Sequence, residues 1–250
     1  VEDLCLSMAG GRRKILEGIH LNVRAGEIVG IAGLVGSGRS ELLRSIFGLA
    51  PGTVSGRLSI DGVAAEVRHP SDAVRHGIGM VPEDRRAQGL VPWQSVAFNT
   101  SLVDLARFCR LGWVNSGHEA SAVDRHCTAL GVKASSWDAP VALCSGGNQQ
   151  KVVLGKWLTM NPAVLLLDEP TRGIDVGAKR EIYALMEELA DAGVAILFVS
   201  SELEEVLGMS DRALVMHEGR LTGELSRNEL SEEAVMQLAT GNSESSGKAA

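Results

Sequence analysis

The sequence predicts an α/β fold in which a mainly parallel sheet is interrupted by a mainly helical insertion. Short apolar runs, such as residues 163–167 and 194–199, are typical of strands buried on both faces of a parallel sheet. Between and after them lie stretches in which apolar residues recur with the helical period. From residue 92 to residue 160 strand signals disappear and helical stretches follow one another. These observations favour one α/β core with an inserted helical part.

The first part of the chain alternates between short strands and connections. β-like runs are expected at residues 4–6, 19–23, 27–32, 57–60 and 78–81. A glycine-rich loop follows the third of these runs, and apolar residues between 42 and 47 then share one helical face. Residues 63–77 are expected to form a connection with a short helix whose cap lies near Ser71 and Asp72.

The remaining elements follow from the same periods. Helices are expected in the insertion at residues 95–110, 119–130 and 146–160. After it we expect strands at 163–168, 194–199, 212–216 and 220–225, and helices at 177–192, 202–208 and 228–239. The helical period is clear at 177–192, where Ile182, Leu185, Met186 and Leu189 share one face. A polar tail at 241–250 is expected to be disordered.

Composition restricts the kind of protein. The chain has 250 residues, of which 45% are hydrophobic, so it can bury a sizeable core. No apolar run reaches the ~18 residues that a membrane-spanning helix needs. The acidic start of the chain lacks the basic region of a secretory signal, and its first residue, Val1, suggests an excised domain or a lost N-terminal part. The net charge of −7 argues against nucleic acid as a partner.

The cysteines and histidines do not predict a metal centre. The four cysteines are far apart and form no C-x-x-C pair, which is typical of a reduced, cytosolic setting. His118, His126 and Cys127 lie close in sequence, and a metal site could be imagined there. No fourth ligand follows at a recognisable spacing, so a solvated helix is the favoured interpretation.

The glycine-rich loop fits the phosphate-loop pattern G-x-x-x-x-G-K-S/T at every fixed position but one. Its candidate binding residues are Gly33, Gly36, Ser37, Gly38, Arg39 and Ser40. Between a strand and a helix, such a loop points backbone N–H groups and the positive end of the helix dipole at an anion. Ser40 offers a hydroxyl to Mg²⁺. Arg39 replaces the usual lysine, and its longer, planar side chain should not fill the same cradle.

A pair of carboxylates, Asp168 and Glu169, follows the apolar run 163–167. In this class of sheet the carboxyl end of a buried strand faces the phosphate loop. Asp168 is therefore expected to hold Mg²⁺, directly or through water, and Glu169 to orient and polarise the attacking water. The plainer interpretation is a strand end with an acidic turn. The following residues 170–175 disfavour it only in combination with the other motifs.

A second glycine element opens the predicted helix 146–160. Ser145 is a good N-cap, and Gly146 and Gly147 expose backbone N–H groups beside the helix dipole. This end of the helix could bind another anion, although one chain rarely needs two such ends for one nucleotide. An ordinary cap is the plainer interpretation. The spacing argues against it, because Asp168 follows one helix and one strand later.

These motifs resemble the nucleotide-binding domain of an ABC transporter, from residue 1 to about residue 240. The segments that carry the resemblance are SGGNQQK at 145–151 and LLLDEPTRGIDVGAK at 165–179. The details resemble the second, C-terminal ATP-binding domain of bacterial monosaccharide importers of the ribose, galactose and xylose type, in which two such domains are fused. The resemblance implies a P-loop NTPase core with an antiparallel β subdomain and a helical subdomain at about 92–160. It also implies ATP and Mg²⁺ as cofactors.

The resemblance further implies a head-to-tail sandwich, in which each nucleotide lies between one domain's phosphate loop and the other domain's signature segment. Ser145, Gly146 and Gly147 are then the signature that touches the partner's nucleotide, and Asp175 lies in the loop that crosses the interface. The implied partners are the first nucleotide-binding domain of the same or another chain, transmembrane permease subunits and, indirectly, a periplasmic sugar-binding protein. The implied location is peripheral, on the cytoplasmic face of the cell membrane.

Three departures from the family pattern fall in the chain's own nucleotide site. Arg39 replaces lysine, Glu83 stands in the place of the glutamine that senses the γ-phosphate, and Ser201 stands in the switch-histidine position. Glu83 and Ser201 join Glu169 as candidate catalytic residues, and Glu83 is also a candidate Mg²⁺ ligand with Ser40 and Asp168. Two smaller departures are Cys144 in place of a leucine and Met8 near the usual adenine-stacking aromatic.

The resemblance therefore implies half of the ATPase engine of a sugar importer. Its own site would bind ATP weakly or hydrolyse it slowly, and its signature would complete the partner's site. One alternative is a soluble ABC-type ATPase acting on DNA or ribosomes, which the acidic charge and the absence of a long basic or coiled-coil insertion disfavour. Another is a purely regulatory domain, which the intact carboxylate pair and signature disfavour.

Overall fold

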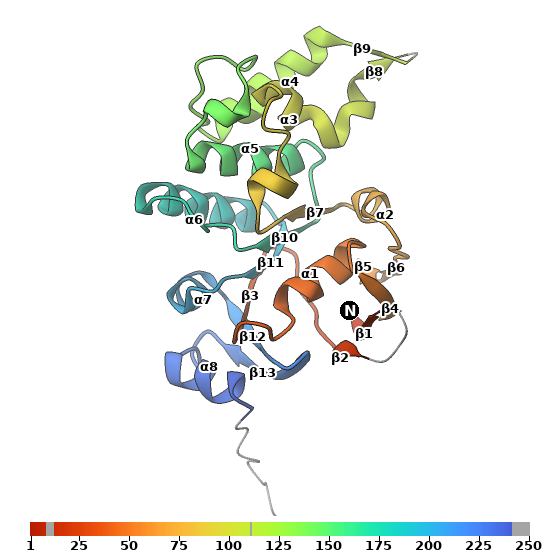
Figure 1. Ribbon diagram of the computed structural model, residues 1–250, viewed down its shortest axis with the longest axis vertical. Coiled ribbons are helices and arrows are strands. Elements are labelled where there is room, and N and C mark those ends of the chain that lie inside the picture. Colours follow the sequence, from red (N-terminus) through yellow and green to blue (C-terminus); the bar gives the residue numbers. More distant parts are fainter. Residues whose placement is uncertain (9–12, 111, 242–250) are drawn as a thin grey trace, which may run out of the picture.

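A six-stranded sheet lies at the centre of the structure, a computed structural model that describes residues 1–8, 13–110 and 112–241. Its strand order is β13-β12-β3-β11-β10-β7 (Figure 1). The strands are β3 (Ile28–Gly33), β7 (Ile78–Val81), β10 (Val164–Asp168), β11 (Ala195–Val199), β12 (Arg212–His217) and β13 (Arg220–Ser226). All neighbours pair in parallel except β12 and β13. The parallel core and its apolar strands confirm the prediction, whereas the predicted tail lies outside the described residues.

A second, antiparallel sheet packs beside this core. It has the order β2-β1-β4, with β1 at Glu2–Met8, β2 at Lys14–Ile19 and β4 at Gly52–Arg57. The strand predicted at 19–23 is wrong, because β2 ends at Ile19, and the pairing of Leu6 with Leu16 sets its register. The run 57–60 is likewise divided between β4 and a small hairpin, β5 (Ser59–Ile60) and β6 (Val63–Ala64).

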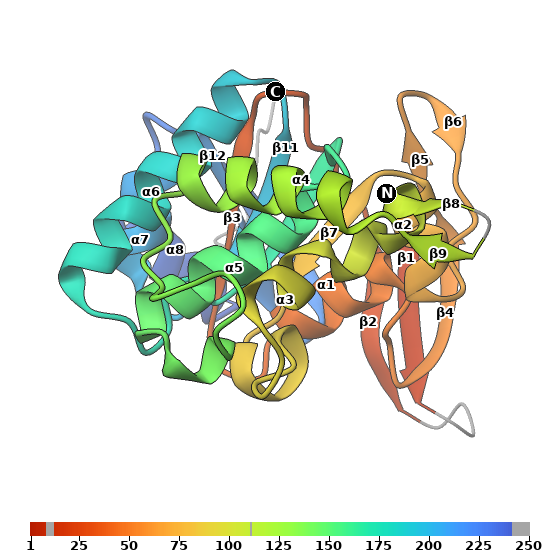
Figure 2. The same cartoon turned by 90° about the horizontal axis from the view of Figure 1, so that it is seen from above.

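The insertion is mainly helical and lies above the sheet (Figures 1 and 2). Its helices are α3 (Val96–Ser101), the 3-10 helix η2 (Leu102–Phe108), α4 (Ser116–Ala129), the 3-10 helix η3 (Val141–Leu143) and α5 (Gly146–Leu158). The continuous helix predicted at 95–110 is wrong, because the backbone leaves helical geometry at Asp104. The expected lack of strands is also wrong, since β8 (Cys109–Arg110) and β9 (Trp113–Val114) form a hairpin here.

The other helices cover the sheet or connect its strands. They are α1 (Arg39–Phe47), α2 (Pro70–Arg75), the π-helix η1 (Arg85–Gly89), α6 (Val176–Asp191), α7 (Leu203–Met209) and α8 (Glu232–Ala239). The cap of α2 is His69 rather than Ser71 or Asp72, and the Asp72 carboxylate accepts from the backbone N of His69. Helix α8 starts later than predicted because Ser231 caps it.

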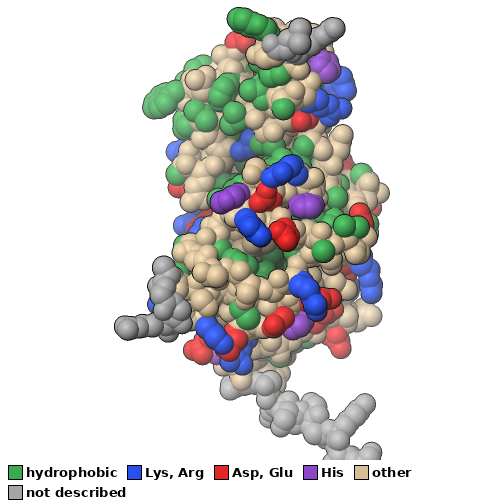
Figure 3. Space-filling model, turned by 90° about the vertical axis from the view of Figure 1, so that its right-hand side faces the viewer, with side chains coloured by type: hydrophobic (Ala, Val, Ile, Leu, Met, Phe, Trp, Pro, Cys, Tyr) green, Lys and Arg blue, Asp and Glu red, His purple; other side chains and the backbone are tan. Residues whose placement is uncertain are grey.

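Two aromatic rings connect the insertion to the core. Phe47 of α1 and Trp157 of α5 pack edge to face with their centroids 5.5 Å apart. Figure 3 shows charged side chains of both signs interspersed around the middle of one face and hydrophobic ones gathered on the insertion. Among the described residues, no helix combines the length and apolar character needed to cross a membrane.

Lys156 on α5 is a buried cation, and it makes stability depend on pH. Its side chain is 7% exposed and its Nζ donates to the Gly89 carbonyl at 2.6 Å. Burial lowers the pKa of Lys156 from 10.5 to about 8. Between these values the unfolded chain binds the extra proton, so this group's contribution to stability rises with pH from about 8 to 10.5.

Lys156→Met should remove that dependence. The buried charge costs the wild type stability below pH 8, and the methionine variant carries no such cost. The difference in unfolding free energy between variant and wild type should therefore shift by about 3 kcal/mol in favour of the wild type across this range. Urea unfolding at pH 7, 8.5 and 10 measures the shift. A difference that is the same at every pH would contradict the expectation.

Candidate functional site

The phosphate loop connects the end of β3 to the start of α1 and lines a cavity of about 450 Å³. Gly38 is the N-cap of α1 with φ 99°, and Gly36 has φ +83°, a region that residues with a Cβ rarely adopt. A Cβ added at Gly36 would meet no atom within 4 Å. The loop thus presents an open, backbone-lined surface beside a helix N-terminus, which is the arrangement that binds phosphate.

Arg39 lines this cavity, but part of its guanidinium hydrogen-bonds to the backbone outside the phosphate loop. Its Nη1 donates to the Ser200 carbonyl at 2.7 Å, at the end of β11. Burial lowers the pKa of Arg39, while the charges of Glu169 and Asp168 oppose that shift. The side chain therefore remains a cation inside the site and is held by the sheet rather than standing free above the loop.

Asp168 and Ser40, the predicted Mg²⁺ ligands, are hydrogen-bonded to each other, and Ser40 lines the cavity. The Ser40 Oγ donates to Asp168 Oδ1 at 2.8 Å, and Asp168 is fully buried at the end of β10. Among the residues that the structure describes, its Oδ2 has no hydrogen-bond partner, and Arg44 Nη2 lies 4.0 Å away. Burial raises the pKa of Asp168. A hydroxyl and an unpartnered carboxylate oxygen fit a hard divalent cation such as Mg²⁺.

Glu83 reaches the same cavity from the end of β7. Its carboxylate makes an ion pair with Arg172 and lies 4.0 Å from Arg44 Nη2. The negative charge of Glu83 is thus already offset by two arginines. Within the described part of the chain, no group of three or more histidine, cysteine and carboxylate side chains could hold a metal ion. Water and phosphate oxygens would therefore have to complete the coordination of Mg²⁺.

Glu169 and Ser201 are paired with each other in the wall of the cavity. The Ser201 Oγ donates to Glu169 Oε2 at 3.0 Å, and both residues line the cavity. Glu169 has φ 51°, in the left-handed region, so its backbone is held in an uncommon conformation. The carboxylate of the predicted base is therefore held by a neutral hydroxyl, that of Ser201.

Glu205 on α7 supports this pair and was missed by the sequence analysis. It is 5% exposed and accepts from Thr171 Oγ1, Ser200 Oγ, the Tyr183 hydroxyl and Lys179 Nζ at 2.6–2.9 Å. Burial acts to raise the pKa of Glu205, but these hydrogen bonds outweigh it and lower the pKa. Glu205 thus fixes the chain after β10 and after β11 at once. A buried acid in a short helix gives no periodic signal for such a role.

The signature residues lie apart from the phosphate loop. Ser145 caps α5 by accepting from the backbone N of Asn148, and Gly146 and Gly147 form the first turn. Asp175 caps α6 and accepts from Ala178 N at 3.0 Å. None of these four residues lines the phosphate-loop cavity. The structure therefore gathers the predicted site residues into two separate groups.

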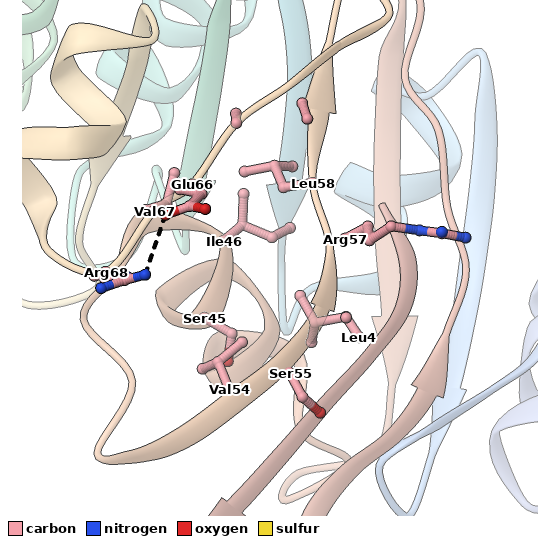
Figure 4. A pocket seen from close by; sticks show the side chains of 13 residues that line it. Leu4, Ser45, Ile46, Val54, Ser55, Arg57, Leu58, Glu66, Val67 and Arg68 are labelled. Atoms are coloured by element: carbon pink, nitrogen blue, oxygen red, sulfur yellow. Dashed lines mark hydrogen bonds and ion pairs between the residues drawn. The ribbon is translucent and has the colours of Figure 1, made fainter.

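Another cavity, of about 370 Å³, lies between α1 and strands β4–β6 (Figure 4). Its wall is largely apolar, with Leu4, Ile46 and Leu58 pointing inward. Its charged residues are paired with each other or with a neighbour, as Arg68 is with Glu66. It contains none of the predicted catalytic groups, so the phosphate-loop cavity is the candidate active site.

Comparisons with known proteins give the family and several relatives of this chain. The family model described as "ABC transporter" matches residues 16–172. The ribose import ATP-binding protein of Bacillus licheniformis is 53% identical over 230 residues, covering 92% of this chain and 46% of that protein. The xylose import ATP-binding protein of Moorella thermoacetica is 52% identical, covering 92% of this chain and 45% of that protein. The chain thus spans about half the length of the curated relatives it matches.

Solved structures confirm the predicted fold class. A dimeric ATP-binding cassette, MJ0796, bound to ADP and Pi, superposes with a TM-score of 0.76 at 22% identity and covers 90% of this chain and 97% of that chain. The cbiO1 protein of Clostridium perfringens, part of the ABC transporter complex cbiONQ, superposes with a TM-score of 0.74 at 26% identity. It covers 94% of this chain and 93% of that chain.

Proposed function

This chain belongs to the ABC transporter family, and on that premise we propose that it binds ATP with Mg²⁺ as one of two domains that power a sugar importer. One observation carries the proposal. Residues 36–40 of the phosphate loop and the Glu169–Ser201 pair line a single cavity, and the buried Asp168 accepts a hydrogen bond from Ser40. The relatives named for ribose and xylose import suggest a monosaccharide as the transported substrate.

The phosphate loop, Asp168, Glu169 and Ser201 then have distinct roles in phosphoryl transfer. The loop from Gly33 to Ser40 binds the phosphates through backbone N–H groups, and Arg39 adds a positive charge. Ser40 and Asp168 would hold Mg²⁺, which would supply positive charge beside the phosphates. Glu169 orients and polarises the attacking water. Ser201 holds the Glu169 carboxylate at 3.0 Å and so sets the direction in which Glu169 accepts a proton.

We further propose that the chain is the second domain of a two-domain subunit and that its own site turns over slowly. Arg39, Glu83 and Ser201 all replace the family's usual residues in this one cavity. The signature Ser145–Gly147, with Asp175, lies outside the cavity and is free to complete the partner domain's site. Catalysis by the pair of domains is thus asymmetric, and the partner's phosphate loop carries most of it.

The remaining partners follow from this assignment. The chain docks on transmembrane permease subunits at the cytoplasmic face of the membrane, and a periplasmic sugar-binding protein acts on it indirectly. Support comes from the relatives' names, which place them in import systems. Which sugar is carried depends on subunits other than this one.

The isolated chain should bind MgATP yet hydrolyse little of it. Without a partner signature its cavity lacks the donors that stabilise the transition state, and Arg39 and Ser201 are poor replacements for lysine and histidine. Equilibrium titration with a fluorescent ATP analogue and a phosphate-release assay measure the two properties.

Glu169→Gln is the matched control, since it removes the proposed base but keeps the shape of the side chain. Robust phosphate release by the wild type that this variant abolishes would contradict a slow site. If the wild type bound no nucleotide at all, the proposed function itself would be wrong.

A further inference from the structure

Residues 83–86, which we call the junction segment, connect the phosphate-loop cavity (hereafter the nucleotide cavity) to the turn at residues 172–173 and to helix α5. Glu83 lines the cavity and makes an ion pair with the side chain of Arg172. Asp84 Oδ1 accepts from the backbone N of Arg86 and Ala87 at 3.0 Å and so fixes the start of η1. π-helical turns are rare and are frequently found at functional sites.

Arg85 in this segment holds a turn that follows the carboxylate pair. Its Nη1 donates to the Arg172 carbonyl at 2.7 Å and its Nη2 to the Gly173 carbonyl at 3.2 Å. The same turn is thus held by two contacts. Arg85 hydrogen-bonds to its backbone, and Glu83 forms an ion pair with the side chain of Arg172. A planar fork can span two carbonyls in this way, whereas a lysine ammonium cannot keep both contacts in the same geometry.

The Arg85 guanidinium also lies against the signature. A Cβ added at Gly146 would come within 2.8 Å of Arg85 Nη2, so the glycine leaves room for this side chain. Arg86 Nε donates to Gln149 Oε1 at 3.2 Å, one turn further along α5. The junction segment therefore touches the first turns of α5 at two places and the nucleotide cavity at a third.

We propose that Arg85 is a positioning residue that links the chain's own nucleotide cavity to the signature Ser145–Gly147. This inference rests on the proposed function, since it assumes that a nucleotide binds in the cavity and that the signature serves a partner. When nucleotide and Mg²⁺ bind beside Glu83, their charges alter the strength of its ion pair with Arg172. The turn at Arg172 and Gly173 then shifts, and Arg85, which is hydrogen-bonded to that turn, transmits the shift to Gly146. The link is a contiguous chain of contacts between two parts that can shift.

Hydrogen exchange of the chain, with and without AMP-PNP and Mg²⁺, tests the link. In the wild type, nucleotide should change exchange both at the phosphate loop, residues 33–40, and at the signature, residues 145–150. In Arg85→Gln the change at the phosphate loop should persist and the change at the signature should be lost. In Arg85→Lys the change at the signature should be only partly retained, because an ammonium cannot make the hydrogen bonds to the carbonyls of both Arg172 and Gly173 in the same geometry. Arg57→Gln, at an exposed arginine of β4 far from the segment, should behave as the wild type.

The outcomes separate the inference from its premise. If the wild type shows no change at residues 33–40, nucleotide does not bind and the proposed function fails. If Arg85→Gln binds nucleotide and the signature still responds as in the wild type, Arg85 is not the link. Unfolding of each variant in urea, measured alongside, shows whether a lost response reflects a general loss of structure. Should Arg85→Gln prove unstable, Arg85→Lys alone decides the question, and a full wild-type response in it overturns the inference.

Discussion

Ser145→Arg is expected to lower ATP turnover of the two-domain subunit, assembled with its permease, by about 100-fold or more, the loss seen when a preorganised donor to the transition state is removed. Ser145 caps α5, and the proposed partner nucleotide would meet the N–H groups of this first turn. Arginine removes the cap and places a long, charged side chain between the signature and the γ-phosphate. Binding of nucleotide to the chain's own cavity should not change, because Ser145 does not line it.

A second serine cap provides the control. Ser231 caps α8 in the same way, by accepting from Ala234 N at 3.2 Å, and α8 lies at the other end of the molecule from the insertion (Figure 1). Ser231→Arg should cost a similar stability, about 1 kcal/mol for a lost N-cap, and leave turnover intact. Phosphate release by both purified variants makes the comparison. Unchanged turnover with Ser145→Arg would favour a purely regulatory domain.

Much of the site could be predicted from the sequence, because backbone motifs dictate local geometry. A glycine loop between a strand and a helix favours a turn that presents backbone N–H groups, and Asp168 falls at a strand end beside this loop. Strand β7 has the predicted bounds, since its four residues are apolar and fully buried. Features encoded by a few consecutive residues were thus accessible without the structure.

The missing features depend on contacts between distant residues. Glu205 contacts Thr171, which lies 34 positions earlier, and Glu83 contacts Arg172, which lies 89 positions later. No spacing rule predicts such pairs, because they form only when strands distant in the sequence become neighbours in the sheet. The π-helix after Glu83 was not predicted either. Its start is fixed by Asp84, whose side chain accepts from the backbone N of Arg86 and Ala87, and an aspartate cap does not distinguish a π-helix from an α-helix. The connection between the two predicted groups of residues therefore required the structure.

Asp168→Asn is expected to weaken binding of MgATP to the isolated chain by about 10- to 100-fold, the loss typical of a disturbed metal site. Asparagine keeps an acceptor for Ser40 Oγ but removes the carboxylate charge and replaces one oxygen with an amide nitrogen. Binding of ATP in the presence of EDTA should change little. Titration with a fluorescent ATP analogue, with and without Mg²⁺, measures both affinities.

The stability of the Asp168→Asn variant shows whether a loss of MgATP affinity comes from the missing carboxylate or from a damaged fold. Burial raises the pKa of Asp168 above its unfolded value of 3.8, so the ionised carboxylate destabilises the fold at neutral pH. The asparagine variant should therefore be at least as stable as the wild type in urea. Glu41→Gln, which removes a negative charge from the lining of the cavity, controls for charge alone. Equal losses of affinity with and without Mg²⁺ would show that Asp168 shapes the cavity and does not hold the metal, because a metal ligand matters only when the metal is there.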